Sequence, residues 1–191
     1  IDRQACSSAG VDVVRRFTGG RGVLHDDELT YSLVAGLRDG IPRGVTASYR
    51  VLSEVLVEAY RLLGVNAEMT SRSRGRSASA ACYLHATKAD LSLGDAKLSG
   101  SAQVWHKGTV LQHGSILRSR DAELEARVFR LDASGARDLS ACTATLADIF
   151  GEAPDRTEIA DALIRGLEEV LGATVVRDEF NAEERRLAAT L

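Results

Sequence analysis

The sequence predicts an α+β domain in which a mixed, mostly antiparallel sheet is flanked by helices. Apolar residues recur at helical spacing over residues 48–63 and again over 157–171, which indicates two amphipathic helices. Apolar and polar residues alternate through 97–115, which is typical of a β-hairpin. Strands and helices are interspersed without a regular βαβ period, so we favour a mixed sheet and treat residues 1–191 as a single domain.

The N-terminal third reads as strands around a glycine-rich turn. The β-branched run Val11–Arg15 indicates a strand that leads into the turn Phe17–Gly22. Further strand is expected at Val23–Leu24 and over Leu29–Val34. Glycines let a backbone approach a ligand, and backbone N–H groups beside arginines suit a carboxylate, a phosphate or a polarised carbonyl. An ordinary hairpin turn is an equal alternative.

The first amphipathic helix has recognisable ends. Thr46 or Ser48 is expected to cap its start, and Gly64 is expected to end it. The chain then returns to a strand over Val65–Thr70. Ser71–Ala81 is rich in serine, arginine and glycine, so it reads as a mobile basic loop that is suited to closing over a substrate.

The hairpin holds the residues with the most distinctive chemistry. Its two strands are expected on either side of the connection Trp105–Gly108. This hairpin places Lys97 near the start of one strand and His113 near the end of its partner, so both are expected to face one cleft.

Beyond the hairpin the pattern predicts mainly helices. A helix is expected over Asp121–Leu131, and either a short helix or an extended segment over Ala141–Phe150. After the second amphipathic helix, Thr174–Val176 reads as a short strand. A sequence typical of a capping box, from Asn181 to Glu184, begins a terminal helix.

The composition excludes several classes of protein. With 45% apolar residues, 27% charged residues and a net charge of −3, the chain resembles soluble globular proteins and not nucleic-acid-binding ones. No apolar run is long enough to span a bilayer and no signal segment opens the chain, so we expect a cytoplasmic protein, and a monomer. Cys6, Cys82 and Cys142 are odd in number and lack metal-ligand spacing, which predicts reduced thiols and no metal site.

Four stretches of sequence carry a family resemblance. Arg15–Asp26, RRFTGGRGVLHD, resembles the signature block of the superfamily of lipoate-protein ligases and octanoyltransferases, which is related to the biotin protein ligases. Lys97–Gln103, KLSGSAQ, and Leu111–Leu117, LQHGSIL, resemble the lysine block and the His-Gly-Ser block of that family, in the same order. Cys82-Tyr83 resembles the Cys-Phe pair of its cysteine-dependent octanoyltransferases of the LipM type.

The resemblance implies a biotin/lipoate protein ligase-like catalytic domain with a sheet-lined tunnel for an acyl chain. Members of the family carry a longer segment ahead of Val11. We therefore expect this sequence, which begins at Ile1 without a methionine, to be part of a longer protein.

The activity implied by the resemblance is transfer of an octanoyl or lipoyl group in protein lipoylation. The donor is an acyl carrier protein thioester, and the acceptor is a lysine of a lipoyl-domain protein such as the glycine cleavage H protein or a dehydrogenase E2. A thiolate is a strong nucleophile that divides one difficult transfer into two easier steps. Cys82 is the candidate nucleophile, with Lys97, Lys88 or His85 to stabilise its thiolate.

The resemblance also assigns roles around the acyl group. Lys97 is expected to reach the acyl carbonyl or carboxylate oxygen, while His113 orients the lysine or takes a proton. The apolar slot for the octyl chain is assigned by strand alternation to Val23, Leu24, Tyr31 and Val104. The residues expected to bind the acyl group or the rest of the substrate are Arg16, Thr18, Gly19, Gly20, Arg21, His25, Gly100, Ser101, Ala102, His113 and Gly114.

Two other functions remain open. An ATP-dependent lipoate ligase would bind ATP and magnesium with the same glycine-rich turn and would not need Cys82. A noncatalytic binder of lipoyl or acyl ligands is favoured by the turn before Lys97, where Asp95-Ala96 replaces the Gly-Lys usual in the family. The transferase needs no cofactor beyond its acyl substrate.

Overall fold

The structure is a computed structural model that describes residues 1–70, 74–75, 80–87 and 90–190. Its strands are β1 (Glu28–Gly36), β2 (Glu68–Met69), β3 (Arg74–Gly75), β4 (His85–Ala86), β5 (Leu91–Leu93), β6 (Ala96–His106) and β7 (Thr109–Leu117). Five of them form a sheet in the order β1-β7-β6-β5-β2, in which neighbouring strands are antiparallel, and β3 pairs separately with β4. The predicted fold class, a mostly antiparallel sheet with flanking helices, is confirmed.

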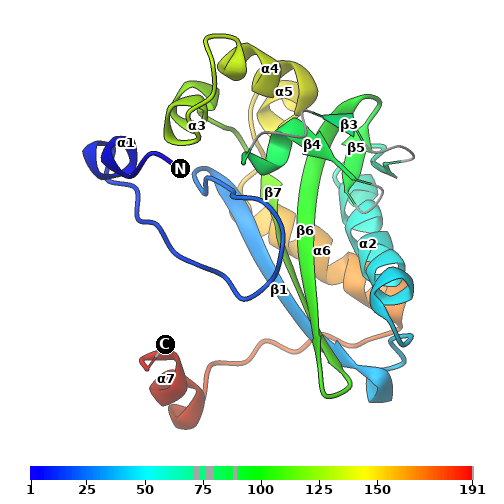
Figure 1. The fold of residues 1–191 in the computed structure, drawn as a ribbon. Coiled ribbons are helices and arrows are strands. Elements are labelled where there is room, and N and C mark those ends of the chain that lie inside the picture. Colours follow the sequence, from blue (N-terminus) through cyan, green and yellow to red (C-terminus); the bar gives the residue numbers. More distant parts are fainter. Residues whose placement is uncertain (71–73, 76–79, 88–89, 191) are drawn as a thin grey trace.

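Two long helices cover one face of the sheet (Figure 1). The α-helices are α1 (Arg3–Ser8), α2 (Val45–Leu62), α3 (Ala122–Val128), α4 (Gly135–Cys142), α5 (Leu146–Phe150), α6 (Arg156–Leu171) and α7 (Ala182–Ala188). The 3-10 helices are η1 (Leu37–Asp39) and η2 (Cys82–Leu84). Leu56 of α2 and Ile159 of α6 pack in one core cluster with Leu98 of β6 and Ile116 of β7, which fixes both helices on the sheet.

The central hairpin is confirmed with a tighter connection than predicted. Trp105 and His106 still pair with β7, so the turn consists only of Lys107 and Gly108. Both have positive φ, 47° and 85°, as a two-residue type I′ turn requires. The short turn fixes the register of the two strands, and with it the positions of the site residues that they carry.

The helix α2 is confirmed, but its predicted cap is wrong. The N-cap is Gly44, with no side-chain hydrogen bond to the first turn. Ser48 lies one turn inside the helix, where its Oγ donates to the Gly44 carbonyl at 2.8 Å and lies 2.9 Å from Oε1 of Gln103 on β6. The hydroxyl therefore ties the helix to the sheet. Gly64, with a φ of 86°, directly follows the end of the helix as predicted.

The predicted strand Val11–Arg15 is wrong. Residues 9–27 form an irregular segment, which we call the N-terminal loop, and its one β-bridge joins Gly22 to Ala81 within the described residues. The preceding helix α1 was not predicted. The valines of this loop border a cavity instead of pairing with a strand. Val14 is the most exposed of them, with 86% of its surface accessible.

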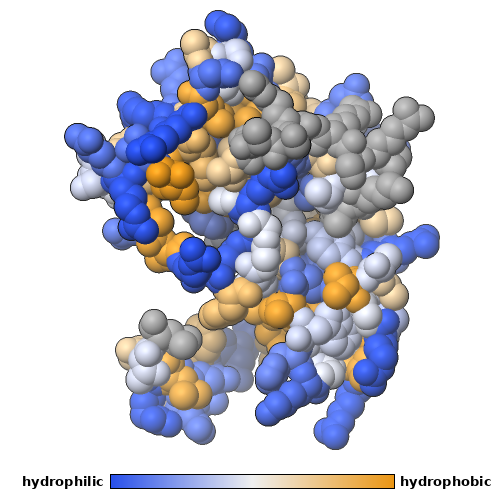
Figure 2. All heavy atoms as spheres, in the orientation of Figure 1, coloured by the Kyte–Doolittle hydropathy of each residue, from blue (hydrophilic) through white to orange (hydrophobic). Residues whose placement is uncertain are grey.

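The C-terminal region departs from the prediction in one segment. Thr174–Val176 is irregular and not a strand. Asn181 caps α7 by accepting hydrogen bonds from the backbone N–H of Glu183 and Glu184, so the predicted capping box is confirmed. We call residues 173–190 the C-terminal arm. In Figure 2 a gap separates α7 from the rest of the molecule, and hydrophobic residues of the arm lie in the open.

Two further points concern loops and membranes. Most of the predicted mobile loop, residues 71–73 and 76–79, lies outside the described residues, as does Lys88. In the described part of the chain, no helix has the length and apolar character needed to cross a membrane.

Candidate active site

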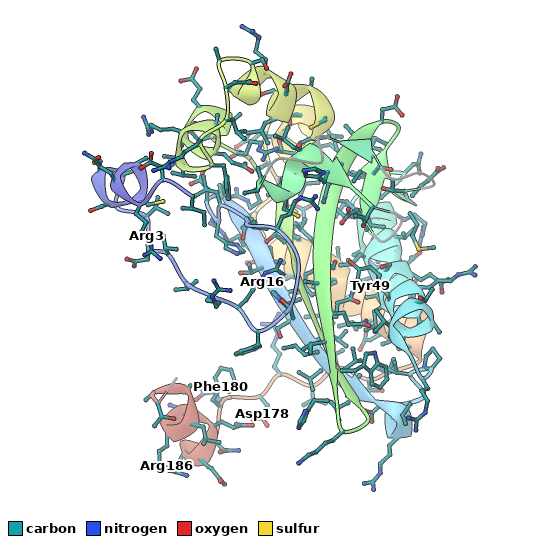
Figure 3. The ribbon with its side chains drawn as sticks, viewed as in Figure 1. Arg3, Arg16, Tyr49, Asp178, Phe180 and Arg186 are labelled. Atoms are coloured by element: carbon teal, nitrogen blue, oxygen red, sulfur yellow. The ribbon has the colours of Figure 1, made fainter. Side chains whose placement is uncertain are left out.

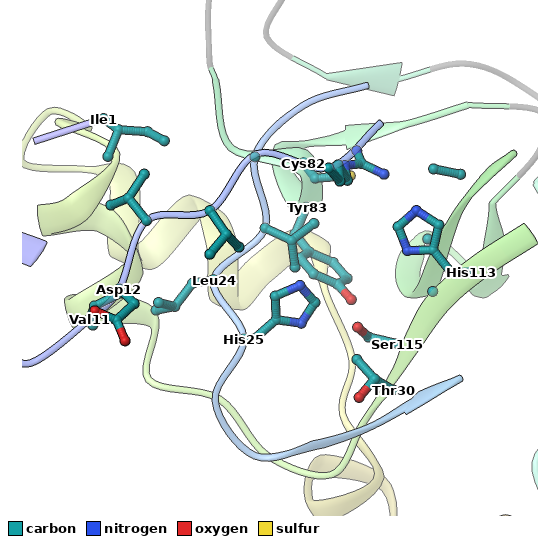
Figure 4. Close-up of a pocket in the computed structure, with 18 of the residues that line it drawn as sticks. Ile1, Val11, Asp12, Leu24, His25, Thr30, Cys82, Tyr83, His113 and Ser115 are labelled. Carbon is teal, nitrogen blue, oxygen red and sulfur yellow. The ribbon is translucent and has the colours of Figure 1, made fainter. Parts of the chain in front are cut away.

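A cavity of about 870 Å³ lies between the central hairpin, the N-terminal loop and η2 (Figure 4). One wall is apolar and is formed by Val11, Val13, Leu24, Val128 and Phe129. The opposite wall, on the hairpin, carries polar side chains and glycines. A cavity that is apolar on one side and polar on the other suits a ligand with an aliphatic tail and a polar head.

Cys82 and Lys97 meet at this cavity. Cys82 lines it, and Nζ of Lys97 lies 3.6 Å from its Sγ and 3.4 Å from its carbonyl oxygen. The same ammonium donates to the carbonyl oxygen of His85 at 2.8 Å and pairs with Oδ2 of Asp90 at 3.0 Å. Only 2% of the Lys97 side chain is exposed. A charge this deeply buried requires such partners, because desolvation without them is costly.

Asp90 was not predicted as a site residue. Its Oδ2 accepts hydrogen bonds from both the backbone N–H and the hydroxyl of Thr87, which fix the carboxylate beside Lys97. Only 6% of its side chain is exposed. In the sequence, Asp90 is only an acidic residue seven positions before Lys97, which does not by itself indicate a contact. The pairing of β5 with β6 brings the two side chains together.

The aromatic ring of Tyr83 lies beneath the site between two cations. Nζ of Lys97 is 5.4 Å from the ring centre, and the guanidinium of Arg120 is 4.8 Å from it. Both distances are within the range of cation–π attraction. Tyr83 is 3% exposed, so it supports the lysine from the core side.

The glycine-rich turn holds an arginine in the cavity. Nη2 of Arg16 donates to the carbonyl oxygen of Arg21 at 2.9 Å, and Nη1 donates to the hydroxyl of Thr18 at 3.0 Å. A Cβ on Gly20, which has a φ of 110°, would lie 2.7 Å from Nη2 of Arg16. A side chain at this position would strain the backbone and displace the guanidinium, so the turn favours glycine. Figure 3 shows Arg16 on the loop that crosses in front of the sheet.

His113 of β7 is linked to the same turn. Its Nε2 lies 2.7 Å from the hydroxyl of Thr18, which also accepts from Arg16. Burial lowers the pKa of His113 from its ordinary value, and the positive charge of Arg16 lowers it further. The imidazole is therefore neutral at neutral pH, and it joins the hairpin to the N-terminal loop.

His25 forms a second pair with an acidic residue. Its Nδ1 is hydrogen-bonded to Oε1 of Glu28, the first residue of β1. This hydrogen bond raises the pKa of His25, while partial burial and the charge of Arg16 act against it. Glu28 was not predicted as a site residue, and its side chain is 4% exposed.

Polar side chains continue beneath the hairpin toward α2. The hydroxyl of Tyr31 lies 2.5 Å from Oγ of Ser101, and both residues line the cavity. The hydroxyl of Tyr49 on α2 donates to the Ser101 carbonyl at 2.8 Å (Figure 3). A Cβ on Gly114 would lie 2.6 Å from the carbonyl oxygen of Gly100, so no larger residue fits this part of the wall.

Most of the predicted site residues surround one cavity. Those that line it are Arg16, His25, Cys82, Gly100, Ser101, Ala102, His113 and Gly114. Lys97 and Thr18 lie behind the lining, each against a residue that faces the cavity. Of the predicted apolar slot, Val23, Leu24 and Tyr31 line the cavity, whereas Val104 does not.

Gly19, Gly20 and Arg21 do not line the cavity. The prediction was that the backbone of this turn would face the ligand. The turn instead closes on Arg16, whose side chain reaches the cavity in its place. The described residues contain no cluster of three or more His, Cys, Asp or Glu side chains arranged to hold a metal ion.

Comparison with known proteins agrees with this architecture. Residues 1–168 match the family model of the lipoyl protein ligase A/B catalytic domain. A curated relative, the octanoyltransferase LipM of Kyrpidia tusciae, is 40% identical over 203 residues, which cover 100% of this chain and 74% of the relative.

Two solved structures share the fold. A lipoate-protein ligase A bound with ATP has a TM-score of 0.80 and 26% identity, covering 100% of this chain and 71% of that one. The bipartite lipoate protein ligase of an archaeal lipoylation system from Thermoplasma acidophilum has a TM-score of 0.78 and 25% identity, covering 99% and 69%. By sequence and by fold, the chain belongs to the family of lipoyl protein ligase A/B catalytic domains.

Proposed function

We propose that this protein is an octanoyltransferase that carries the octanoyl group as a thioester on Cys82. The donor is an acyl carrier protein thioester, and the acceptor is a lysine of a lipoyl-domain protein. The observation that carries the proposal is the buried ammonium of Lys97, whose Nζ lies 3.6 Å from Sγ of Cys82. The name of the relative, octanoyltransferase LipM, supports the choice of acyl group.

The first half-reaction loads the enzyme. The Cys82 thiolate attacks the carbonyl carbon of the donor thioester, a new C–S bond forms, and the C–S bond to the carrier breaks as its thiolate leaves. The ammonium of Lys97 stabilises the attacking thiolate and then the negative charge that develops on the carbonyl oxygen. Donors in this position typically contribute about 10²- to 10³-fold to the rate.

The second half-reaction unloads it. The neutral amine nitrogen of the acceptor lysine attacks the thioester carbon and a C–N bond forms. The C–S bond breaks, and one proton passes from the nitrogen to the departing Cys82 sulfur. An acceptor of the lipoyl-domain class is supported by the solved archaeal system, in which a lipoate protein ligase was studied with its E2 lipoyl domain.

We place the reaction in the cytoplasm, where thiols stay reduced.

The cavity fits an octanoyl chain. Its volume of about 870 Å³ lies in the range of small-molecule sites. Burying about seven aliphatic carbons at about 0.8 kcal/mol each gives roughly 6 kcal/mol of binding free energy. The apolar wall at Val11, Leu24 and Phe129 is the surface against which such a chain would pack.

The ATP-dependent ligase is the second candidate, because a lipoate-protein ligase A with bound ATP shares the fold. The glycine-rich turn argues against it, since Gly20 and Arg21 lie against the Arg16 guanidinium, and Arg16, not the glycines, lines the cavity. The hypothesis of a noncatalytic binder rested on the altered turn before Lys97, and the structure weakens that support. The altered turn at Asp95-Ala96 leaves Lys97 buried beside Cys82.

Intact-mass measurement tests the proposal. After mixing with octanoyl acyl carrier protein, the wild type should gain one octanoyl group without ATP. Cys82→Ser should gain no thioester, and its transfer to the lipoyl domain should be lost. Cys142→Ser is the matched control, because the Cys142 thiol bonds the Tyr83 carbonyl oxygen at 3.5 Å and does not line the cavity.

Two results would contradict the proposal. Transfer by Cys82→Ser at the wild-type rate would remove the thioester mechanism. An absolute requirement for ATP would replace the transferase with the ligase.

A further inference from the structure

His25 and Glu28 form a histidine–carboxylate pair at the cavity that the thioester mechanism has not used. Nδ1 of His25 is bonded to Oε1 of Glu28, and the hydroxyl of Ser115 on β7 donates to the same oxygen at 2.9 Å. An ionised carboxylate only accepts hydrogen bonds, so the hydrogen between the pair belongs to Nδ1. In the neutral imidazole, Nε2 therefore carries the free lone pair.

The position of His25 suits a reactant that arrives from solution. His25 lines the same cavity as Cys82, and Figure 4 shows its ring among the lining side chains. Its side chain is 57% exposed, whereas that of Glu28 is 4% exposed. A buried acid thus orients a ring that solvent, and a lysine from another protein, can reach.

The carboxylate of Glu28 also borders a second, small cavity. Oε2 of Glu28 has no hydrogen-bond partner among the described residues, and this small cavity has a volume of about 10 Å³. Arg120 borders the same cavity, where its ion-pair partner is Glu125. A cavity of this volume is at the lower limit for holding one water molecule, which would give Oε2 a hydrogen-bond partner.

Lys97 and His113, two other basic residues of the site, are not suited to accept a proton. The Lys97 ammonium has no lone pair, and its hydrogens are directed to Asp90, to the His85 carbonyl and to Cys82. Nε2 of His113 is engaged by Thr18, and burial and the charge of Arg16 lower its pKa, which makes it a weak base. Of the three groups compared, His25 is the one with an accessible basic nitrogen.

We propose that His25 is the general base of the second half-reaction and that Glu28 is its positioning residue. The inference rests on the proposed function. As the acceptor nitrogen attacks the thioester carbon, Nε2 of His25 takes a proton from that nitrogen, the C–N bond forms and the C–S bond breaks. The imidazolium then returns the proton to the departing Cys82 sulfur, so the enzyme ends with a neutral imidazole and a thiol.

The pH dependence follows from the groups around His25. Those that act on it in the described structure are Glu28 on β1 and Arg16 on the N-terminal loop, with His113 on β7 across the cavity. The hydrogen bond with Glu28 raises the pKa of His25 above its ordinary value of 6.5. Below that raised pKa the ring is protonated and cannot accept a proton. The rate of the step should therefore be low in acid, rise with pH, and level off at a pH above the raised pKa of His25.

The test separates the two half-reactions. Loading is followed by intact mass after mixing with octanoyl acyl carrier protein, and unloading by mixing purified octanoyl-enzyme with a lipoyl domain. His25→Gln should load within about twofold of the wild type and should unload about 10²-fold more slowly. Added imidazole should restore part of the lost rate. His106→Gln, on the exposed end of the hairpin, is the matched control and should change neither step.

Glu28→Gln provides a second variant. It should slow unloading less than His25→Gln and should move the bend in the unloading rate to lower pH, because the hydrogen bond that raises the pKa of His25 is weakened. A purely structural role for Glu28 would reduce the amount of folded protein and leave the bend where it is.

The outcomes distinguish the inference from the function on which it rests. If the wild type forms no octanoyl adduct, the proposed function fails. If the adduct forms but His25→Gln unloads at the wild-type rate, or slows loading and unloading equally without rescue by imidazole, His25 is not the base and the inference alone is overturned.

Discussion

At the scale of single residues, the site depends on the buried ion pair between Asp90 and Lys97. The two side chains are 6% and 2% exposed, and Oδ2 lies 3.0 Å from Nζ. Asp90→Asn keeps the shape but leaves the ammonium without its counter-ion. We expect the free energy of unfolding to fall by about 3 kcal/mol, as when one partner of a buried pair is removed, measured by urea denaturation.

Asp95→Asn is the matched control for this change. Asp95 lies on the same chain segment but is exposed, so its replacement should alter stability by less than about 0.5 kcal/mol. Equal stabilities for Asp90→Asn and the wild type would mean that Asp90 does not hold the lysine.

The sequence predicted the residues with distinctive flanking motifs and missed those that act through contacts. Cys82, Lys97 and His113 stand in recognisable blocks, and the fold brings all three to one cavity or directly behind it. Asp90 and Glu28 have no such block. Their importance comes from burial and from partners that the folded sheet supplies, and neither property can be seen in a linear pattern.

At the scale of elements, the packing of α2 against α6 depends on one glycine. A Cβ on Gly166 would lie 2.7 Å from the carbonyl oxygen of Val55 and 3.2 Å from the backbone nitrogen of Ala59. Backbone atoms in a helix have little freedom to move aside. Gly166→Ala should therefore destabilise the protein by about 1–3 kcal/mol in thermal or urea unfolding, despite the better helix propensity of alanine.

Arg165→Ala, on the exposed side of α6, should change stability by less than about 0.5 kcal/mol. A gain in stability for Gly166→Ala would show that helix propensity outweighs the contact and that the two helices can separate slightly without loss.

Periodicity of apolar residues correctly predicted the helices and strands that bury one face. It failed for apolar segments that do not pair with a strand. The two amphipathic helices and the hairpin have one face on the core, so their patterns repeat at 3.6 or 2 residues. Val11 and Val13 instead contact the cavity from an irregular loop, so a β-branched run appeared without a strand. Thr174–Val176 likewise pairs with no strand of the described structure, and it is exposed.

At the scale of the whole molecule, the C-terminal arm is peripheral. Residues 172–190 are exposed. The arm is joined to α6 by a hydrogen bond from the Val175 N–H to Glu168 at 3.1 Å and by an ion pair of Arg177 with Asp161 at 3.3 Å. Exposed pairs contribute at most about 1 kcal/mol. Truncation after Gly172 should lower the melting temperature by less than about 4 °C, measured by calorimetry.

The truncated protein should also form the octanoyl adduct as fast as the full chain, because no residue of the arm lines the cavity. A larger loss of stability would show that the arm stabilises the fold, and slower loading would show that it contributes to catalysis.

The arrangement around Lys97 also selects the form of the cation at this position. The three groups of partners, Asp90, the His85 carbonyl and Cys82, surround a small ammonium whose three hydrogens diverge. A guanidinium is flat and presents its hydrogens in one plane, so arginine would keep the charge but not the directions of these contacts. Gly100 closes the remaining side, since a Cβ there would lie 3.2 Å from Nζ. A substitution usually regarded as conservative is therefore excluded here by shape, and lysine is the one side chain with both the reach and the outline of this site.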